Sequence, residues 1–92
     1  MVRQQVPGWQ YFDEHVESCD VVRGRALDTL EEDDRAVAEW FIGAPEGRRR
    51  VLDVGCGAGY PGLYVAGHVG ELVGIDAAPN MVRAAQAHKT RL

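Results

Sequence analysis

The sequence predicts an α/β fold with parallel strands, and three observations support this prediction. Two short apolar runs, 51–54 and 71–76, have the length and the β-branched content of buried strands. A glycine-rich turn follows the first run. A helical segment from about Pro61 to His68 then separates the two runs. Two strands joined through a helix form a crossover unit in which they run parallel, and we expect the first strand to be covered on both faces.

The N-terminal part of the chain predicts only weak helical structure. A weakly helical pattern runs from Asp13 to about Arg25, with few apolar positions. We therefore divide the chain into a partly helical N-terminal segment, residues 1–28, and an α/β part, residues 29–92.

A stronger helix signal precedes the first strand. Thr29 and Glu32 have the spacing of a capping box, with Thr29 at the N-cap and Glu32 three residues later. The helix is expected to continue to about Ile42, and a further helix is expected to begin near Pro79. One apolar stripe of the first of these helices is expected to face the core, and it consists of Leu30, Val37, Trp40 and Phe41.

The turn after the first strand has the features of a site for an adenosine-containing ligand. Glycines at 55, 57 and 59 permit a tight turn and allow a ligand to approach backbone amides. Asp76 ends the second strand, 21 positions after Gly55. A carboxylate at this place is positioned to accept hydrogen bonds from a ribose.

Two alternatives to this interpretation stay open at the level of the residues. Residues 57–62 also match the dinucleotide pattern G-x-G-x-x-G, which predicts an NAD- or FAD-binding unit. Asp53 and Pro61 argue against a pyrophosphate there, because a carboxylate repels phosphate and proline has no N–H to donate. The loop better suits a ligand with an ammonium and a sulfonium group. The second alternative is a glycine turn that binds no ligand.

Two segments resemble the first two motifs of the class I S-adenosylmethionine-dependent methyltransferases. They are Val51-Leu-Asp-Val-Gly-Cys-Gly-Ala-Gly59 and Gly74-Ile-Asp-Ala-Ala-Pro-Asn-Met81, and the resemblance covers residues 50 to about 89. It implies a Rossmann-like α/β fold, S-adenosylmethionine as cofactor and methyl transfer as activity. The resemblance implies that the cofactor is bound by Asp53, Gly55, Cys56, Gly57, Gly59, Asp76, Ala77 and Met81.

The resemblance also implies a role for each of these residues. Asp53 would lie near the ammonium of the cofactor, and Asp76 would bind the ribose hydroxyls. Ala77 and Met81 would flank the adenine. The three glycines would line the methionine part, and Cys56 would contribute its backbone. In that family N-terminal segments often fold over the cofactor or help to form the acceptor pocket. The aromatic residues Trp9, Tyr11 and Phe12 would then be more than packing residues.

The same resemblance implies a seven-stranded sheet, of which this sequence supplies the first two strands. The Rossmann-like fold is therefore expected to be incomplete, and the chain to be a truncated or fragmentary form. The first strand would lack a neighbour on one side, so we expect self-association or pairing with a complementary chain through the open edge. The acceptor is expected to be a small molecule of unknown identity, and no catalytic residue is predicted. A non-catalytic nucleotide-binding or pairing remnant is the competing hypothesis.

Composition excludes several other classes of function. A net charge of −4 argues against a nucleic-acid surface, which needs clustered Lys and Arg. No secretion signal or membrane-spanning run is present, so no membrane partner and a cytoplasmic location are expected. Cys19 and Cys56 are expected to be reduced, and no metal-ligand spacing is present. The histidines His15, His68 and His88 are expected to be structural or exposed, without a neighbour that would make them functional.

Overall fold

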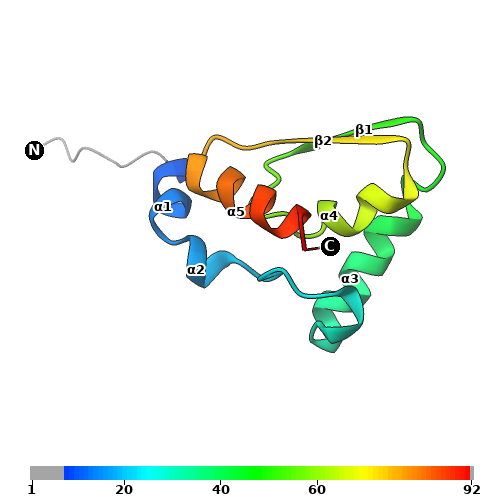
Figure 1. The fold of residues 1–92 in the computed structure, drawn as a ribbon, viewed down its shortest axis with the longest axis horizontal. Coiled ribbons are helices and arrows are strands. Elements are labelled where there is room, and N and C mark those ends of the chain that lie inside the picture. Colours follow the sequence, from blue (N-terminus) through cyan, green and yellow to red (C-terminus); the bar gives the residue numbers. More distant parts are fainter. Residues whose placement is uncertain (1–7, 92) are drawn as a thin grey trace, which may run out of the picture.

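The computed structural model describes residues 8–91 of the chain (Figure 1). In chain order its elements are α1 (Gly8–Glu14), α2 (Val16–Cys19), η1 (Leu27–Thr29), α3 (Glu32–Gly43), β1 (Arg50–Val54), α4 (Gly62–Val65), η2 (Ala66–His68), β2 (Glu71–Ile75) and α5 (Pro79–Lys89), where η denotes a 3-10 turn. Residues 1–7, which belong to the predicted N-terminal segment, lie outside the described residues.

The two strands form a parallel sheet, as the sequence predicted. Arg50 pairs with Glu71 at the start of the ladder, and Val54 pairs with Ile75 at its end. Both strands lie within one residue of their predicted bounds. A parallel pair of strands joined through a helical crossover and packed against helices fits an incomplete Rossmann-like α/β fold.

The crossover between the strands is more irregular than the single helix predicted from Pro61 to His68. One turn of α-helix, α4, is followed directly by the 3-10 turn η2, and Pro61 occupies the N-cap instead of the first helical position. Gly70 then connects to β2. Any side chain at position 70 would collide with the carbonyl oxygen of Arg49. The chain thus returns to the sheet through a tight passage that only glycine fits.

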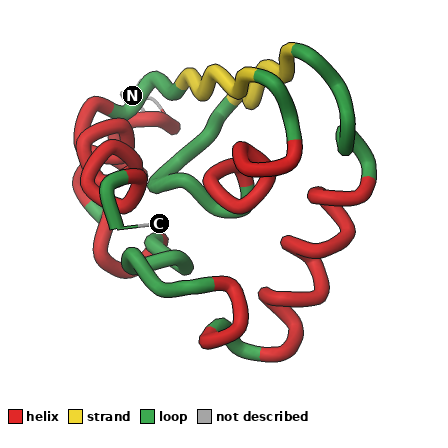
Figure 2. The backbone as a smooth tube through the Cα atoms, turned by 45° about the vertical axis from the view of Figure 1, so that its right-hand side comes forward, coloured by secondary structure: helices red, strands yellow, loops and turns green. Residues whose placement is uncertain are grey.

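The described helices all lie on one side of the sheet (Figures 1 and 2). Alternation along β1 directs Val51 and Asp53 towards the helices and Leu52 and Val54 away from them. The outer face is apolar and exposed, with the following exposed fractions: Leu52 59%, Val54 73%, Val73 47% and Ile75 48%. The expectation that β1 is covered on both faces is therefore wrong for residues 8–91, because no described helix crosses this outer face.

The core joins the N-terminal segment to the α/β part. Val22 is fully buried and packs with Leu30, Ala38 and Tyr64. The hydroxyl of Tyr64 donates a hydrogen bond to the carbonyl of Arg25 at 2.7 Å, which fixes the N-terminal segment against α4. Residues 8–28 are consequently packed on the α/β part.

The N-terminal helices differ from the weak pattern between Asp13 and Arg25. Helix α1 begins earlier, at Gly8, and the short α2 ends at Cys19. Residues 20–25 turn instead, because Arg23 and Gly24 adopt positive φ angles of 46° and 70°. These conformations are incompatible with a continuing right-handed helix.

The predicted capping box is also wrong. Thr29 belongs to η1, and its hydroxyl donates to the carbonyl of Ala26 at 2.7 Å. Leu30 is extended, so α3 starts at Glu32 behind an N-cap, Glu31, that makes no side-chain hydrogen bond. The hydroxyl is used locally in a 3-10 turn, which competes with capping for the same group.

The apolar stripe predicted on this helix faces outward for most of its length. Trp40 is 68% exposed, and Val37 and Phe41 are exposed as well. The buried position of α3 is Ala38, which packs on α4. Periodicity correctly predicted an amphipathic helix, but the described residues do not cover its larger side chains.

Candidate cofactor-binding site

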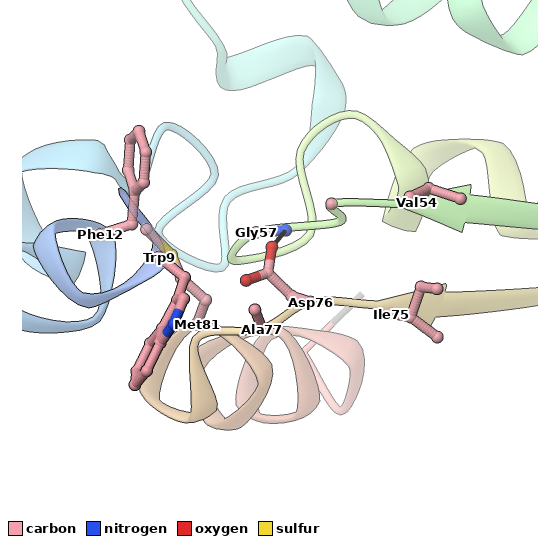
Figure 3. A pocket seen from close by; sticks show the side chains of 9 residues that line it. Trp9, Phe12, Val54, Gly57, Ile75, Asp76, Ala77 and Met81 are labelled. Atoms are coloured by element: carbon pink, nitrogen blue, oxygen red, sulfur yellow. Dashed lines mark hydrogen bonds between the residues drawn. The ribbon is translucent and has the colours of Figure 1, made fainter. Parts of the chain in front are cut away.

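A pocket of about 720 Å³ lies at the carboxyl ends of β1 and β2. Ligands of open parallel α/β sheets bind at this edge of the sheet. The pocket is lined by Trp9, Phe12, Val54, Gly55, Gly57, Ile75, Asp76, Ala77 and Met81 (Figure 3).

The glycine turn presents bare backbone to this pocket. Gly55 and Gly57 have φ angles of 72° and 56°, which side chains rarely adopt. A Cβ built on either residue would meet no atom within 4 Å, so the space in front of them is open. Gly59 is different, because a Cβ there would collide with the side chain of Leu63. Gly55 and Gly57 therefore leave room for a ligand, whereas Gly59 allows the turn to pack.

The carboxylate of Asp76 is held in a fixed position at the centre of the site. Its Oδ2 accepts a hydrogen bond from the N–H of Gly57, and its Oδ1 accepts one from the N–H of Ala78, each at 2.8 Å. A carboxylate oxygen can accept a second hydrogen bond, so both oxygens keep capacity for a ligand hydroxyl. Asp76 is consequently oriented by the protein and is not merely a solvated acid at a strand end.

The N–H groups of the turn are largely used inside the protein. Gly55 and Cys56 both donate to the carbonyl of Ile75, at 2.8 and 3.0 Å. Gly57 donates to Asp76, as described above. A pyrophosphate site needs several unpaired N–H groups that converge on the anion. The geometry of this turn therefore disfavours the dinucleotide alternative.

Asp53 lies behind the turn and does not line the pocket. Its Oδ2 is buried without a hydrogen-bond partner, against Gly62, where any side chain would contact it. Burial raises the pKa of the Asp53 carboxyl above its ordinary value, and the neighbouring Asp76 carboxylate raises it further. Asp53 was expected to lie near the ammonium of the cofactor, but it is not among the residues that line the pocket.

Cys56 also lies behind the turn. Its Sγ packs so closely on Gly74 that a Cβ there would lie 3.0 Å away. Burial raises the pKa of this thiol, and the negative charges of Asp53 and Asp76 raise it further. A high pKa disfavours the thiolate, so Cys56 lacks the character of a nucleophile. Both cysteines of the chain are free thiols, as predicted.

Five of the eight predicted site residues come together in the pocket, namely Gly55, Gly57, Asp76, Ala77 and Met81. Asp53, Cys56 and Gly59 instead line a separate cavity between the turn and α5. Four lining residues were not among the eight predicted cofactor-binding residues, namely Trp9, Phe12, Val54 and Ile75, although the resemblance implied a role for the segment that carries Trp9 and Phe12. Strand alternation is the signal that points to Val54 and Ile75, since it directs them to the outer face.

Helix α5 receives its cap from a distant residue. Ala78 precedes it and has no side chain that can bind the first N–H groups. Asp13 of α1 supplies the missing acceptor, because its Oδ1 accepts the N–H of Asn80 at 2.7 Å. The side-chain amide of Asn80 donates in return to the carbonyl of Asp13 at 3.2 Å. This pair fixes α1 beside the pocket.

The structure supports neither of two other kinds of site within residues 8–91. No group of three or more His, Cys, Asp or Glu side chains in this range is arranged to hold a metal ion. No helix among these residues is both long and apolar enough to span a membrane.

Comparison with known families agrees with the geometry of the site. Residues 51–92 match the family model described as a methyltransferase domain. This range contains the glycine turn, Asp76 and the whole of α5. Over these residues the chain is similar to the methyltransferase-domain family. Comparisons with curated proteins and with solved structures gave no match.

Proposed function

We propose that this protein is an S-adenosylmethionine-dependent methyltransferase that transfers a methyl group to a small-molecule acceptor. The fixed carboxylate of Asp76, next to open space in front of Gly55 and Gly57, is the observation that carries the proposal. This arrangement supports a ligand whose ribose binds to Asp76 and whose amino-acid part lies over the backbone of Gly55 and Gly57. Asp76, Ala77 and Met81 would hold the adenosine part of the cofactor.

The charges around the site support a cationic ligand over a dinucleotide. Asp76 lines the pocket, and Asp53 lies close enough behind it for the two carboxyl groups to influence each other. Negative charge in this place repels a pyrophosphate and attracts an ammonium or a sulfonium.

The bound cofactor would supply an electrophilic methyl group, and the contribution of this chain is binding and orientation. Displacement at a sulfonium carbon depends mainly on the alignment of nucleophile, carbon and leaving group. Asp76 is the ionisable residue among those that line the pocket, and its oxygens are committed to Gly57 and Ala78. We therefore assign no general base to this chain.

Calorimetric titration of the chain with S-adenosylmethionine, S-adenosylhomocysteine and NAD tests the proposal. We expect the two adenosyl sulfur compounds to bind more tightly than NAD, because the N–H groups of the turn are already bonded. Tighter binding of NAD, or binding of none of the three, would overturn the assignment.

A non-catalytic pairing function is favoured by a different observation. The outer sheet face carries Leu52, Val54, Val73 and Ile75, all exposed and without a charge among them. An uncharged apolar patch is complementary to itself, as a two-fold symmetric dimer requires. We propose that this face and the free edge of β1 associate with a second copy of the chain.

The free thiols of Cys19 and Cys56 support a location in the reducing cytoplasm.

A further inference from the structure

Helix α1 brings two aromatic side chains to the pocket. Trp9 and Phe12 are three residues apart and therefore lie on one face of the helix. Both line the pocket, beside Met81 and across from Asp76 (Figure 3). Trp9 is 45% exposed and Phe12 is 49% exposed. Each residue is thus about half exposed, which leaves surface at the pocket that a ligand can contact.

The position of these rings depends on the pair formed by Asp13 and Asn80. Asp13 directly follows Phe12, and its two hydrogen bonds with Asn80 attach α1 to the first turn of α5. The same turn carries Met81, the neighbouring residue in the pocket. The hydrogen bonds between Asp13 and Asn80 therefore set the distance between the rings of α1 and the part of the pocket that α5 forms.

We propose that Trp9 and Phe12 form an aromatic wall that contacts the purine base of an adenosine-containing ligand, and that Asp13 is the residue that positions this wall. The inference rests on the proposed function. A ribose bound at Asp76 carries its base into the adjoining part of the pocket, where Trp9, Phe12 and Met81 lie. Aromatic rings and a thioether both make favourable contacts with the face of a base.

The helix itself offers a matched control. Tyr11 is 54% exposed, similar to its neighbours, but it does not line the pocket. Its ring stacks on His15 at a centroid distance of 4.2 Å and meets the ring of Phe12 edge-on at 5.5 Å, outside the pocket lining. Tyr11→Ala thus removes an aromatic ring from α1 without removing one from the proposed wall.

The test compares two ligands by calorimetry on the full chain. S-adenosylhomocysteine contains the base and the amino-acid part, whereas 5′-methylthioadenosine contains the base without the amino-acid part. Trp9→Ala and Phe12→Ala are each expected to weaken both ligands by about five- to a hundredfold, the range measured for the loss of one stacked base. Tyr11→Ala is expected to bind both as the unmodified chain does.

Asp13 is tested by a conservative pair of variants in a Trp40→Phe background, where Trp9 is the single tryptophan of the sequence. Ligand is expected to change the emission of Trp9. Asp13→Ala should weaken this change, because Asn80 loses its acceptor. Asp13→Asn keeps an acceptor oxygen and should restore the emission change. If Asp13 acted through its negative charge alone, Asp13→Asn would not restore the change.

The outcomes separate this inference from the proposed function. If the unmodified chain binds neither ligand, both proposals are overturned. If it binds them and the Trp9 and Phe12 variants bind equally well, the aromatic wall is wrong and the proposed function stands. A loss confined to S-adenosylhomocysteine would place the rings at the amino-acid end and would also overturn the wall. Equal Trp9 emission changes in the unmodified and Asp13→Ala proteins would overturn the positioning role.

Discussion

The imidazole of His88 and the carboxylate of Asp20 form a pair in the interior, with Nε2 2.6 Å from Oδ2. The two residues are 68 positions apart, and their side chains are only 9% and 11% exposed. The pair joins the turn after α2 to the last turn of α5. It attaches the N-terminal segment at one end of α5, while Asp13 and Asn80 attach it at the other. His88, which was expected to be structural or exposed, is thus structural, and the expectation of a solvent-compatible setting is wrong for this residue.

We predict that His88→Ala lowers the free energy of unfolding by about 3 kcal/mol, because it leaves the Asp20 carboxylate buried without its partner. For a domain of this size such a loss lowers Tm by more than about 10 °C. Thermal unfolding followed by circular dichroism measures it. His68→Ala is the control, because His68 is exposed and lies 3.8 Å from Glu46. Equal melting of the two variants would contradict a stabilising role for the pair.

Asp76 is predicted to have two separable roles. Asp76→Ala removes both the acceptor for Gly57 and the proposed ribose ligand, so we expect S-adenosylhomocysteine affinity to fall by about 3 kcal/mol or more. Asp76→Asn keeps one acceptor oxygen and should retain part of the affinity. Calorimetry gives the affinities, and thermal melts without ligand report on the turn. Unchanged affinity in both variants would show that Asp76 does not contact the ligand.

The raised pKa of Asp53 predicts a specific dependence of stability on pH. Because the folded state holds this proton more tightly, the stabilising contribution of Asp53 is full below its ordinary pKa of 3.8. The contribution is lost as the pH rises through the raised pKa of the folded state. Asp53→Asn, which cannot ionise, should therefore match the unmodified chain in acid and exceed its stability near neutral pH.

Denaturant unfolding of both proteins across this pH range measures the difference. Asp33→Asn serves as a control, since Asp33 is an exposed carboxylate in the first turn of α3. A stability difference for Asp53→Asn that does not grow between acid and neutral pH would contradict the burial of the carboxyl group.

The outer sheet face predicts association of the chain. Leu52→Glu combined with Val73→Lys places charges on this face at two exposed positions and should shift the chain towards monomer. Sedimentation velocity over a range of protein concentrations measures the change. Val37→Glu is the control, because Val37 is similarly exposed but lies on α3. Loss of association in the control, or no loss in the double variant, would show that the sheet face is not the contact.

Local patterns were enough to predict the part of the fold that carries the turn. Short apolar runs limited by glycine and charge predicted both strands within one residue. Glycine spacing predicted the turn, and the distance to Asp76 predicted which acid faces it. These features depend on backbone conformation and on side chains close in sequence. A single sequence is therefore enough to predict the strands and the turn.

Patterns alone did not predict which predicted glycine-turn residues face a ligand. Asp53 and Gly59 occur within the same motif as Gly57, yet both lie behind the turn. The direction of each side chain depends on how α4 and α5 pack beneath the turn, through contacts such as that between Gly59 and Leu63. The periodicity of α3 failed for a similar reason, since it predicts an apolar face but not the element that covers it.

The sequence by itself determined the α/β class, the parallel strands and the position of Asp76 at the end of β2. Only the tertiary structure decided that Asp13 caps α5, that Asp20 pairs with His88, and that α1 places Trp9 at the pocket. The physical reason is distance along the chain. The two polar pairs join residues 67 and 68 positions apart, and such contacts form only when the packed core brings the segments together.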